Sequence, residues 1–217
     1  MGRPINGYRN AAGERIPGVT TIIGRFKESG GLLQWAFKQG QAGVPHLYHE
    51  RDKAAEAGGI AHDMIEAHIL KKPFPDCMQH PEELQKKARN AFEQYLEWRG
   101  QTSIEILETE TPYVSEAHQF GGTIDALGRD AKGRTILLDW KTSNAVYQDY
   151  LIQLAAYALL LEECTVHRPQ GFHLLRISKE SADFAHHFFG ELEEAKRAFI
   201  LMRELYDIDS RLKKRAA

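Results

Sequence analysis

Two aspartates and a lysine in the middle of the chain have the types and spacing to hold a metal ion and act on a phosphodiester. Asp125 lies in one apolar run, and Asp139 and Lys141 close a second run fourteen positions later. The segment between the runs, 129–134, is polar and contains a glycine, as expected of a turn. Because two adjacent strands would bring all three side chains to one edge of a sheet, and strands disfavour aspartate, the pattern indicates a functional site.

Asp139 and Lys141 are expected on the same face of their strand, because side chains alternate along a strand. A structural ion pair is the simpler interpretation, and each aspartate alone is equally well explained as a turn residue at a strand end. The second acid favours catalysis. Two carboxylates can hold a divalent metal that lowers the pKa of a bound water, while the lysine orients that water or helps to deprotonate it.

Three further polar residues are candidates for the same site. Gln153 and Tyr157 are neighbours on one helix face, although a surface glutamine beside a core tyrosine is a common alternative. His62 follows the pair Gly58-Gly59, which allows close approach of a substrate or another backbone. A lone helical histidine is more often structural, but this one would complete a metal site otherwise made of oxygens.

Glu110 ends an expected strand that carries three glutamates. A solvated face explains these acids most simply, yet Glu110 is well placed to reach the metal region.

Composition indicates an ordinary globular protein. The chain has 217 residues, 42% hydrophobic and 27% charged, with a formal net charge of −2. Its two cysteines, Cys77 and Cys164, exclude a four-thiolate zinc or iron–sulfur site within one chain. The absence of a long apolar run and of a signal-peptide core predicts an intracellular protein without a membrane span.

Net charge does not indicate a nucleic-acid binder, so phosphate contacts are expected from local basic patches. The candidates are Arg25, Lys27, Lys38 and the tail residues Arg211, Lys213, Lys214 and Arg215. For the tail, a solvated helix end placed favourably against the helix dipole is the alternative. The candidates for stacking on single-stranded bases are Trp35, Phe37 and Tyr48. For these side chains, burial in a small core is the alternative.

The order of expected elements predicts an α/β fold: a central mixed sheet flanked by helices, with a helical N-terminal part. Helices are predicted to about Arg25 (capped by Thr20 or Thr21), over 32–37, 49–70, 82–99, 150–163 and 191–211, and strands over 102–110, 119–129, 135–141, 171–177 and 182–189. At Gly58-Gly59 either the helix breaks or a closely approaching group compensates. We expect a single domain over 1–217, with a mainly helical region over 1–100 and the sheet core over 101–217.

With these residues in order, the chain resembles the PD-(D/E)XK nuclease superfamily, specifically its RecB-like exonuclease branch. The similarity lies in Gly59-Ile60-Ala61-His62 with Glu66, Gly122-Thr123-Ile124-Asp125, Asp139-Trp140-Lys141, and the Gln-x-x-x-Tyr motif Gln153-Leu154-Ala155-Ala156-Tyr157. Within the branch it looks most like the mitochondrial genome maintenance exonuclease and related phage exonucleases. It departs from relatives that carry a four-cysteine iron–sulfur cluster or a fused helicase.

The resemblance implies a restriction-endonuclease-like core and a DNA exonuclease that uses Mg²⁺ or Mn²⁺ and no iron–sulfur cluster. It implies His62, Asp125, Asp139 and the Trp140 carbonyl as ligands of the first metal, with Glu110 as a candidate ligand of a second. It further implies that Lys141 activates the attacking water, that Gln153 aligns the nucleophile or phosphate, and that Tyr157 contacts the DNA backbone or supports Gln153.

The implied substrate is DNA, as single strands or duplex ends, in phage or bacterial recombination, replication or repair. A recombinase, a single-strand-binding protein or a helicase is the implied partner, and the cytoplasm of a bacterial or phage-infected cell the implied location. Ring trimers and monomers both occur among relatives, so the oligomeric state stays open. Two alternatives also stay open: a structure-selective or non-specific endonuclease on the same site, and a non-catalytic DNA-binding module.

Overall fold

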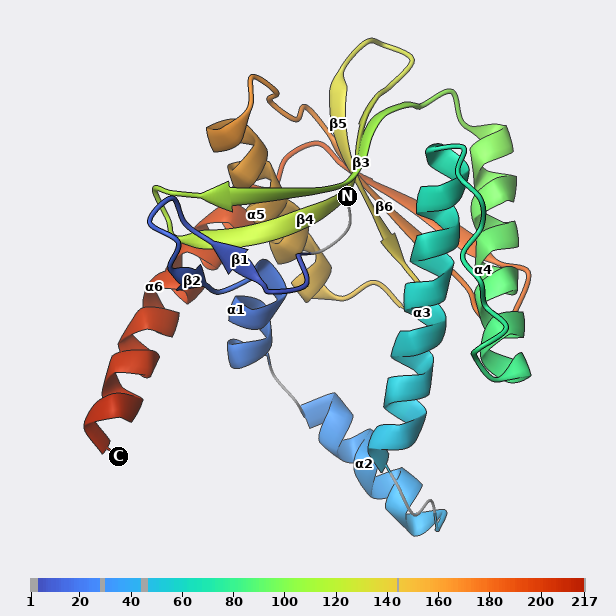
Figure 1. The fold of residues 1–217 in the computed structure, drawn as a ribbon, viewed down its shortest axis with the longest axis horizontal. Coiled ribbons are helices and arrows are strands. Elements are labelled where there is room, and N and C mark those ends of the chain that lie inside the picture. The colour runs from blue at the N-terminus through green and yellow to red at the C-terminus, as the bar shows by residue number, and fades with distance from the viewer. Residues whose placement is uncertain (1–3, 28–29, 44–46, 144, 217) are drawn as a thin grey trace.

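A five-stranded mixed sheet with helices on both faces forms the body of the protein (Figure 1). The computed structural model describes residues 4–27, 30–43, 47–143 and 145–216. Its elements are β1 (Tyr8–Arg9), β2 (Arg15–Ile16), α1 (Val19–Phe26), α2 (Gly30–Gln41), α3 (Leu47–Ile69), α4 (Glu82–Gln101), β3 (Glu105–Ser115), β4 (Phe120–Arg129), β5 (Thr135–Lys141), α5 (Gln148–Cys164), β6 (Phe172–Ile177), β7 (Phe184–Phe189) and α6 (Glu193–Ala216). The predicted α/β class with a mixed sheet flanked by helices is confirmed.

The sheet has the strand order β3-β4-β5-β6-β7. The pair β5–β6 is parallel, and the other neighbouring pairs are antiparallel. A parallel pair needs a crossover connection, which α5 supplies here. The helix that carries Gln153 and Tyr157 is therefore held against the sheet directly after the strand that ends in Lys141.

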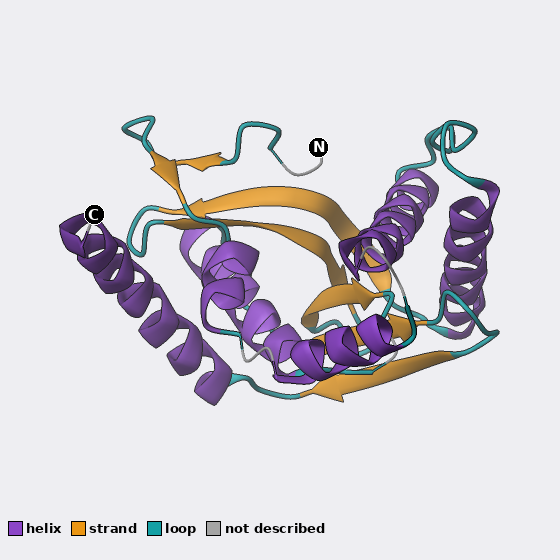
Figure 2. Cartoon of the chain, turned by 90° about the horizontal axis from the view of Figure 1, so that it is seen from below, coloured by secondary structure: helices purple, strands orange, loops and turns teal. Residues whose placement is uncertain are grey.

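Two apolar cores cover the two faces of the sheet. Helices α1, α5 and α6 share one core with the sheet, and α3 and α4 share the other. Figure 2 shows α3 and α4 together at one end of the molecule and α6 at the opposite end. In the α3–α4 core the rings of Tyr95, Trp98 and Trp140 pack edge to face or tilted. This packing holds the Trp140 ring in place. It thereby also holds the backbone of β5 between Asp139 and Lys141.

Helix α4 buries an indole near its end and exposes a neighbouring leucine. Trp98 is buried, whereas Leu96 is 39% exposed. The buried positions Leu84, Ala88, Ala91, Tyr95 and Trp98 follow the helical period, and Leu96 lies off that stripe.

The start of helix α1 also differs from the prediction. Neither Thr20 nor Thr21 caps it: Gly18 occupies the N-cap without a side-chain hydrogen bond. Gly18 instead forms a bridge with Gly121 of β4, which joins the N-terminal segment to the sheet.

The small hairpin formed by β1 and β2 was not predicted from the sequence. Its Tyr8 is buried, and the Tyr8 hydroxyl lies 2.9 Å from the Thr123 hydroxyl. A Cβ atom at Gly121 would lie 2.2 Å from Cγ of Tyr8, so only glycine admits this ring against β4. The hairpin therefore packs against the part of β4 that precedes Asp125.

Strand β3 runs five residues further than expected, to Ser115. It includes Pro112, which is compatible with a strand here because β3 lies at the edge of the sheet. A register shift between Ile106 and Glu108 marks a bulge near its start.

Helix α3 is continuous through Gly58-Gly59, and the two glycines have different surroundings. A Cβ atom at Gly58 would lie 2.6 Å from Oγ1 of Thr142, the residue after Lys141, whereas one at Gly59 would meet no atom within 4 Å. Close approach, the second of the two predicted explanations, therefore accounts for Gly58.

The two glycines give a matched pair of substitutions. Gly59→Ala is expected to stabilise the fold by up to about 1 kcal/mol, because alanine favours helix over glycine. Gly58→Ala should gain less stability or lose some, and should lower activity by displacing Thr142 beside Lys141. Thermal unfolding of both variants and the wild type tests this, and equal shifts in Tm would contradict the close packing at Gly58.

Candidate active site

A cleft of about 780 Å³ lies where β4 and β5 meet α3, α5 and the N-terminal hairpin. Its lining includes every residue predicted for the site except Asp139, which is fully buried. The lining residues from those predictions are His62, Glu110, Asp125, Trp140, Lys141, Gln153 and Tyr157. The structure thus brings together residues from five elements, α3, β3, β4, β5 and α5.

Three potential metal ligands converge inside this cleft. One ligand atom each from His62, Glu110 and Asp125 lies within 4.8 Å of the other two. Nδ1 of His62 is 3.8 Å from Oδ2 of Asp125 and 3.9 Å from Oε1 of Glu110. One nitrogen and two carboxylates at this spacing can share a divalent cation.

Glu110 has an unusual backbone conformation at this point. Its φ is +48°, in the left-handed region, although it is not a glycine. It stands between the pairs Thr109↔Ala126 and Thr111↔Ile124, and hence opposite Asp125. Such a conformation is costly for an ordinary residue and is often kept at functional sites.

Strands β4 and β5 separate at the acidic residues. Their ladder ends at the pair Ala126↔Leu138, one position before Asp125 and Asp139. Oδ2 of Asp125 then accepts a hydrogen bond from the backbone N–H of Trp140, at 2.8 Å. Because the Trp140 indole is buried in the α3–α4 core, this residue contributes backbone atoms to the cleft wall.

Asp139 is completely buried beside Lys141. Nζ of Lys141 lies 2.5 Å from Oδ2 of Asp139, yet neither Asp139 oxygen accepts a well-aligned hydrogen bond from a described residue. Asp139 does not belong to the converging group formed by His62, Glu110 and Asp125. The structure thus places Glu110 nearer to a shared ligand position than the predicted first-metal ligand Asp139.

Burial raises the pKa values of Asp139 and Asp125. Burial raises the pKa of Asp139 to about 7; Lys141 opposes the shift and Asp125 adds to it. Burial likewise raises the pKa of Asp125, with His62 and Lys141 opposing. Buried acids whose ionisation is costly favour a bound cation, because its positive charge removes the cost of ionising them.

The pKa values of the two basic groups are raised as well, in their case by the neighbouring acids and against the effect of burial. Burial would lower the pKa of Lys141, but Asp139 and Asp125 outweigh it and raise that pKa above its usual value. For His62, burial also lowers the pKa, and Asp125 and Glu110 outweigh it. The Lys141 ammonium is therefore protonated at neutral pH and is a hydrogen-bond donor rather than a base in this state.

Gln153 and Tyr157 form a pair on helix α5. Nε2 of Gln153 donates a hydrogen bond to the Tyr157 hydroxyl at 2.7 Å. Burial, with the nearby Asp125 and Asp139 charges, raises the pKa of Tyr157 well above its usual value, so the hydroxyl keeps its proton. Behind the ring, a Cβ atom at Gly122 would lie 2.8 Å from Cε1 of Tyr157.

Several cleft residues were not singled out as functional from the sequence: Tyr8, Thr123, Thr142, Ser143, Tyr150 and Lys179. The Gly121-Gly122 pair was a usable signal, because two glycines inside a buried strand indicate close approach of other groups. Nothing in the sequence indicates which groups approach, since Tyr8 is more than a hundred residues away.

Three of the predicted phosphate contacts are engaged in ion pairs within the protein. Arg25 pairs with Asp209 at 3.2 Å, and Lys27 pairs with Asp149 at 2.6 Å. Lys213 of the basic tail also pairs with Asp209. Arg25 and Lys27 therefore stabilise the packing of α1 beside α6 and α5 in this structure.

Among the stacking candidates, Phe37 is 66% exposed and stays a candidate. The side chains of Trp35 and Tyr48 lie outside the described residues.

A sequence model of the PD-(D/E)XK nuclease superfamily matches residues 32–216. The chain belongs to the PD-(D/E)XK nuclease superfamily. The match includes the His62 region and continues through α6, so the family assignment covers the sheet and all the residues of the candidate site except Tyr8 and those of α1. The predicted restriction-endonuclease-like fold is thereby confirmed. Among curated proteins, none matches the sequence.

Similar solved structures include nucleases. A candidate exonuclease from Eubacterium rectale is 12% identical, with a TM-score of 0.47, over 70% of this chain and 64% of that one. The alkaline exonuclease LHK-Exo from Laribacter hongkongensis, in complex with dAMP, is 12% identical, with a TM-score of 0.39, over 76% of this chain and 92% of that one. A third structure, SSO0001, is 17% identical, with a TM-score of 0.37, over 57% of this chain and 59% of that one. The chain therefore spans about three fifths of two of these proteins, and the family assignment rests on the sequence match.

The residues of the cleft fit the divalent metal that nucleases of this superfamily use. His62, Glu110 and Asp125 offer hard oxygen and imidazole donors at one point, and the buried Asp139 oxygens lack well-aligned donors among the described residues. Among the described helices, none has the length and apolar character to cross a membrane.

Metal binding is expected to strengthen as the pH rises. Carboxylates and imidazole bind a cation only after losing their protons, and the pKa values of Asp139, Asp125 and His62 are all raised. Without metal, the pH acts on folding stability in the opposite direction. Because the folded state holds its Asp139 proton to about pH 7 and the unfolded state releases it near 3.8, this group's contribution to stability falls as the pH rises between those values.

Thermal unfolding with and without Mn²⁺ tests the expected pH dependence of metal binding. The increase in Tm on adding Mn²⁺ should be larger at about pH 8 than at about pH 6. An increase independent of pH would show that the shifted groups do not hold the cation.

Proposed function

We propose that the protein is a metal-dependent deoxyribonuclease that acts as an exonuclease on DNA ends or single strands. The observation that carries the proposal is the meeting of His62, Glu110 and Asp125 beside the Asp139–Lys141 pair in one open cleft. The preference for an exonuclease comes from the Gln153–Tyr157 motif, which is similar to that of the RecB-like branch.

The proposed chemistry is hydrolysis, in which water attacks phosphorus and a sugar hydroxyl leaves. His62, Glu110 and Asp125 would hold Mg²⁺ or Mn²⁺, with Asp139 and the Trp140 carbonyl completing the surroundings. When bound, the cation would supply Lewis-acid activation and would neutralise charge on the phosphate.

Lys141 has the central role among the protein's own groups. Asp139 fixes its ammonium at 2.5 Å, so the charge is positioned before substrate arrives. The ammonium donates hydrogen bonds to the attacking water or to the phosphate oxygens, where negative charge increases in the transition state. The Gln153 amide, held by the Tyr157 hydroxyl, aligns the nucleophile or the scissile phosphate.

Labelled substrates test the proposal. Linear single- and double-stranded DNA, labelled at either end, would be incubated with Mg²⁺, Mn²⁺ or EDTA alongside a circular single strand. Metal-dependent loss of linear DNA only is expected. Cutting of the circle would establish an endonuclease on the same site, and DNA binding without cleavage would establish a non-catalytic module.

A recombinase, a single-strand-binding protein or a helicase is the proposed partner, in recombination, replication or repair. A change in cleavage rate or extent on adding such a protein is the expected sign of that partnership.

A further inference from the structure

We propose that Lys179, on the turn between β6 and β7, binds a backbone phosphate of the DNA and holds the strand in register with the candidate active site. This inference rests on the proposed nuclease function and adds a binding residue to it. Neither the family motifs nor the metal cluster includes Lys179.

The negative charge of the cleft favours a lysine that can bind the phosphates of DNA. Its described lining includes four carboxylates, those of Asp63, Glu66, Glu110 and Asp125. Besides His62, the cationic side chains in that lining are Lys141 and Lys179. Lys141 lies beside Asp139 within the acidic group. Lys179, on a separate turn, adds the other lysine charge of the described lining, and this charge lowers the repulsion between the acidic wall and a DNA backbone.

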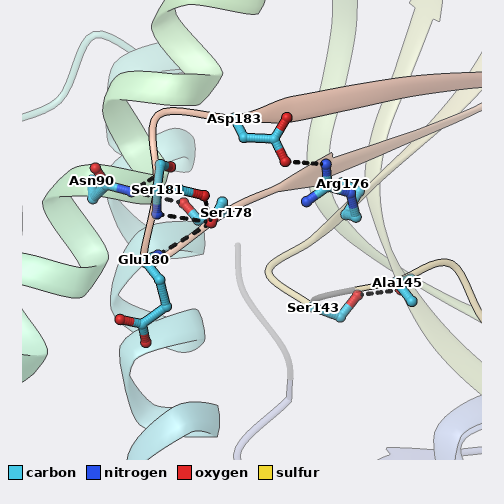
Figure 3. A network of polar contacts seen from close by, with 8 residues as sticks. All are labelled: Asn90, Ser143, Ala145, Arg176, Ser178, Glu180, Ser181 and Asp183. Atoms are coloured by element: carbon cyan, nitrogen blue, oxygen red, sulfur yellow. Dashed lines mark hydrogen bonds and ion pairs between the residues drawn. The ribbon is translucent and has the colours of Figure 1, made fainter.

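The turn that carries Lys179 is held rigidly from two sides. Nδ2 of Asn90, on α4, donates hydrogen bonds to the carbonyl oxygens of Ser178 and Ser181, at 3.1 and 2.9 Å (Figure 3). The two serine hydroxyls lie 2.9 Å apart, and Oγ of Ser178 accepts the backbone N–H groups of Glu180 and Ser181. The backbone on both sides of Lys179 is thus fixed before any ligand arrives.

Ion pairs complete the support of this turn. Arg176 of β6 pairs at 2.5 Å with Asp183, the residue before β7 (Figure 3). Glu180 pairs with Lys87 of α4 at 3.1 Å. Arg176 is also the register partner of Lys141 in the parallel pair β5–β6, so the turn is coupled through two strands to the candidate active site. A rigid scaffold of this kind reduces the entropy lost when a flexible lysine binds a phosphate.

Lys179 is already partly buried in the absence of DNA. Burial lowers the pKa of Lys179, with Lys87 adding to the effect and Glu180 opposing it. A phosphate placed beside the ammonium would stabilise the charged form and reverse this shift. Since lysine binds phosphate as a point charge, we expect the contact to set position and affinity and not to read base sequence.

Binding experiments in the Lys141→Ala background test the proposal without cleavage. A fluorescent single-stranded oligonucleotide would be titrated with protein and Mn²⁺ over a series of salt concentrations. Adding Lys179→Ala should weaken binding several-fold and reduce the slope of log Kd against log salt by about 0.7, the value for one lost phosphate contact on a single strand. Lys179→Arg should retain the slope, because it keeps the charge.

Two further variants separate a specific contact from general effects. Lys132→Ala removes an exposed lysine from the β4–β5 turn, which does not line the cleft, and should change neither Kd nor the slope. Asn90→Ala loosens the turn but keeps the charge, so it should weaken binding with the slope retained. In the otherwise wild-type enzyme, Lys179→Ala should raise KM and leave kcat within about twofold, because a contact present equally in ground and transition states affects binding alone.

The same Kd and slope for Lys179→Ala and Lys132→Ala would overturn the proposal and leave the nuclease function untouched. If neither the parent Lys141→Ala protein nor the wild-type protein binds or cleaves DNA, the proposed function and this inference both fall. A change in thermal unfolding for Lys179→Ala, with binding unaffected, would identify a structural lysine and would also overturn the proposal.

Discussion

Replacing Lys141 with alanine is expected to reduce DNA cleavage by about a hundredfold to a thousandfold or more, the usual cost of removing one preorganised donor at the reacting centre. The ammonium is held by Asp139 at 2.5 Å, and its side chain is only 14% exposed. No described residue in the cleft can replace it without moving, because Lys179 lies on a separate, rigid turn. Single-turnover cleavage of labelled linear DNA measures the loss.

Loss of Lys141 should leave the fold in place. The partner left behind, Asp139, has a raised pKa of about 7, and removal of its cation raises that pKa further, so the carboxyl becomes neutral. Asp139→Asn, which has nearly the same shape, should likewise lose cleavage. Circular dichroism and Tm of both variants should stay close to those of the wild type.

Comparison with Asp125→Asn separates metal binding from the role of the lysine. Asp125 belongs to the converging ligand group and Lys141 does not supply a ligand, so Asp125→Asn should weaken Mn²⁺ binding whereas Lys141→Ala should retain it. Calorimetric titration with Mn²⁺ makes the distinction. Wild-type cleavage rates in Lys141→Ala would show that the Asp139–Lys141 pair is structural.

The strand part of the site could be read from the sequence because local rules determine it. Asp125 and Asp139 are separated by one turn, and the pairing Ala126↔Leu138 brings them to equivalent positions on adjacent strands. Gln153 and Tyr157 meet because they are one helical turn apart, and their hydrogen bond needs no distant contact. Spacing and period alone determine these relations.

What could not be predicted depends on contacts between distant segments. The Tyr8 hairpin is two residues per strand, too short for a periodic signal, and packs on Gly121 through its ring. The position of Glu110 at the ligand point depends on its left-handed backbone, which no spacing rule predicts for a glutamate. The turn that carries Lys179 reaches the cleft only because α4, which ends more than seventy residues earlier in the chain, anchors it.

Gly122→Ala is expected to destabilise the protein by about 1–3 kcal/mol, in the range found for overpacked cores. A Cβ atom there would lie 2.8 Å from Cε1 of Tyr157 and 2.9 Å from Cδ1 of Leu160, both on α5. Both side chains are buried, at 4% and 0% exposure, and α5 is packed against the sheet along its length. The ring of Tyr157 must therefore shift, and the hydrogen bond that holds Gln153 shifts with it.

Activity should fall in Gly122→Ala by more than the loss of stability explains, because the displaced pair is the one that aligns the nucleophile or phosphate. The measurement is Tm together with cleavage at a temperature at which the variant is fully folded. Gly100→Ala is the matched control: it lies in α4, its added Cβ would meet no atom within 4 Å, and it should keep wild-type activity with equal or higher Tm. If Gly122→Ala instead cleaves DNA like the wild type when folded, then the position of the Gln153–Tyr157 pair does not limit the reaction, and the motif serves packing alone.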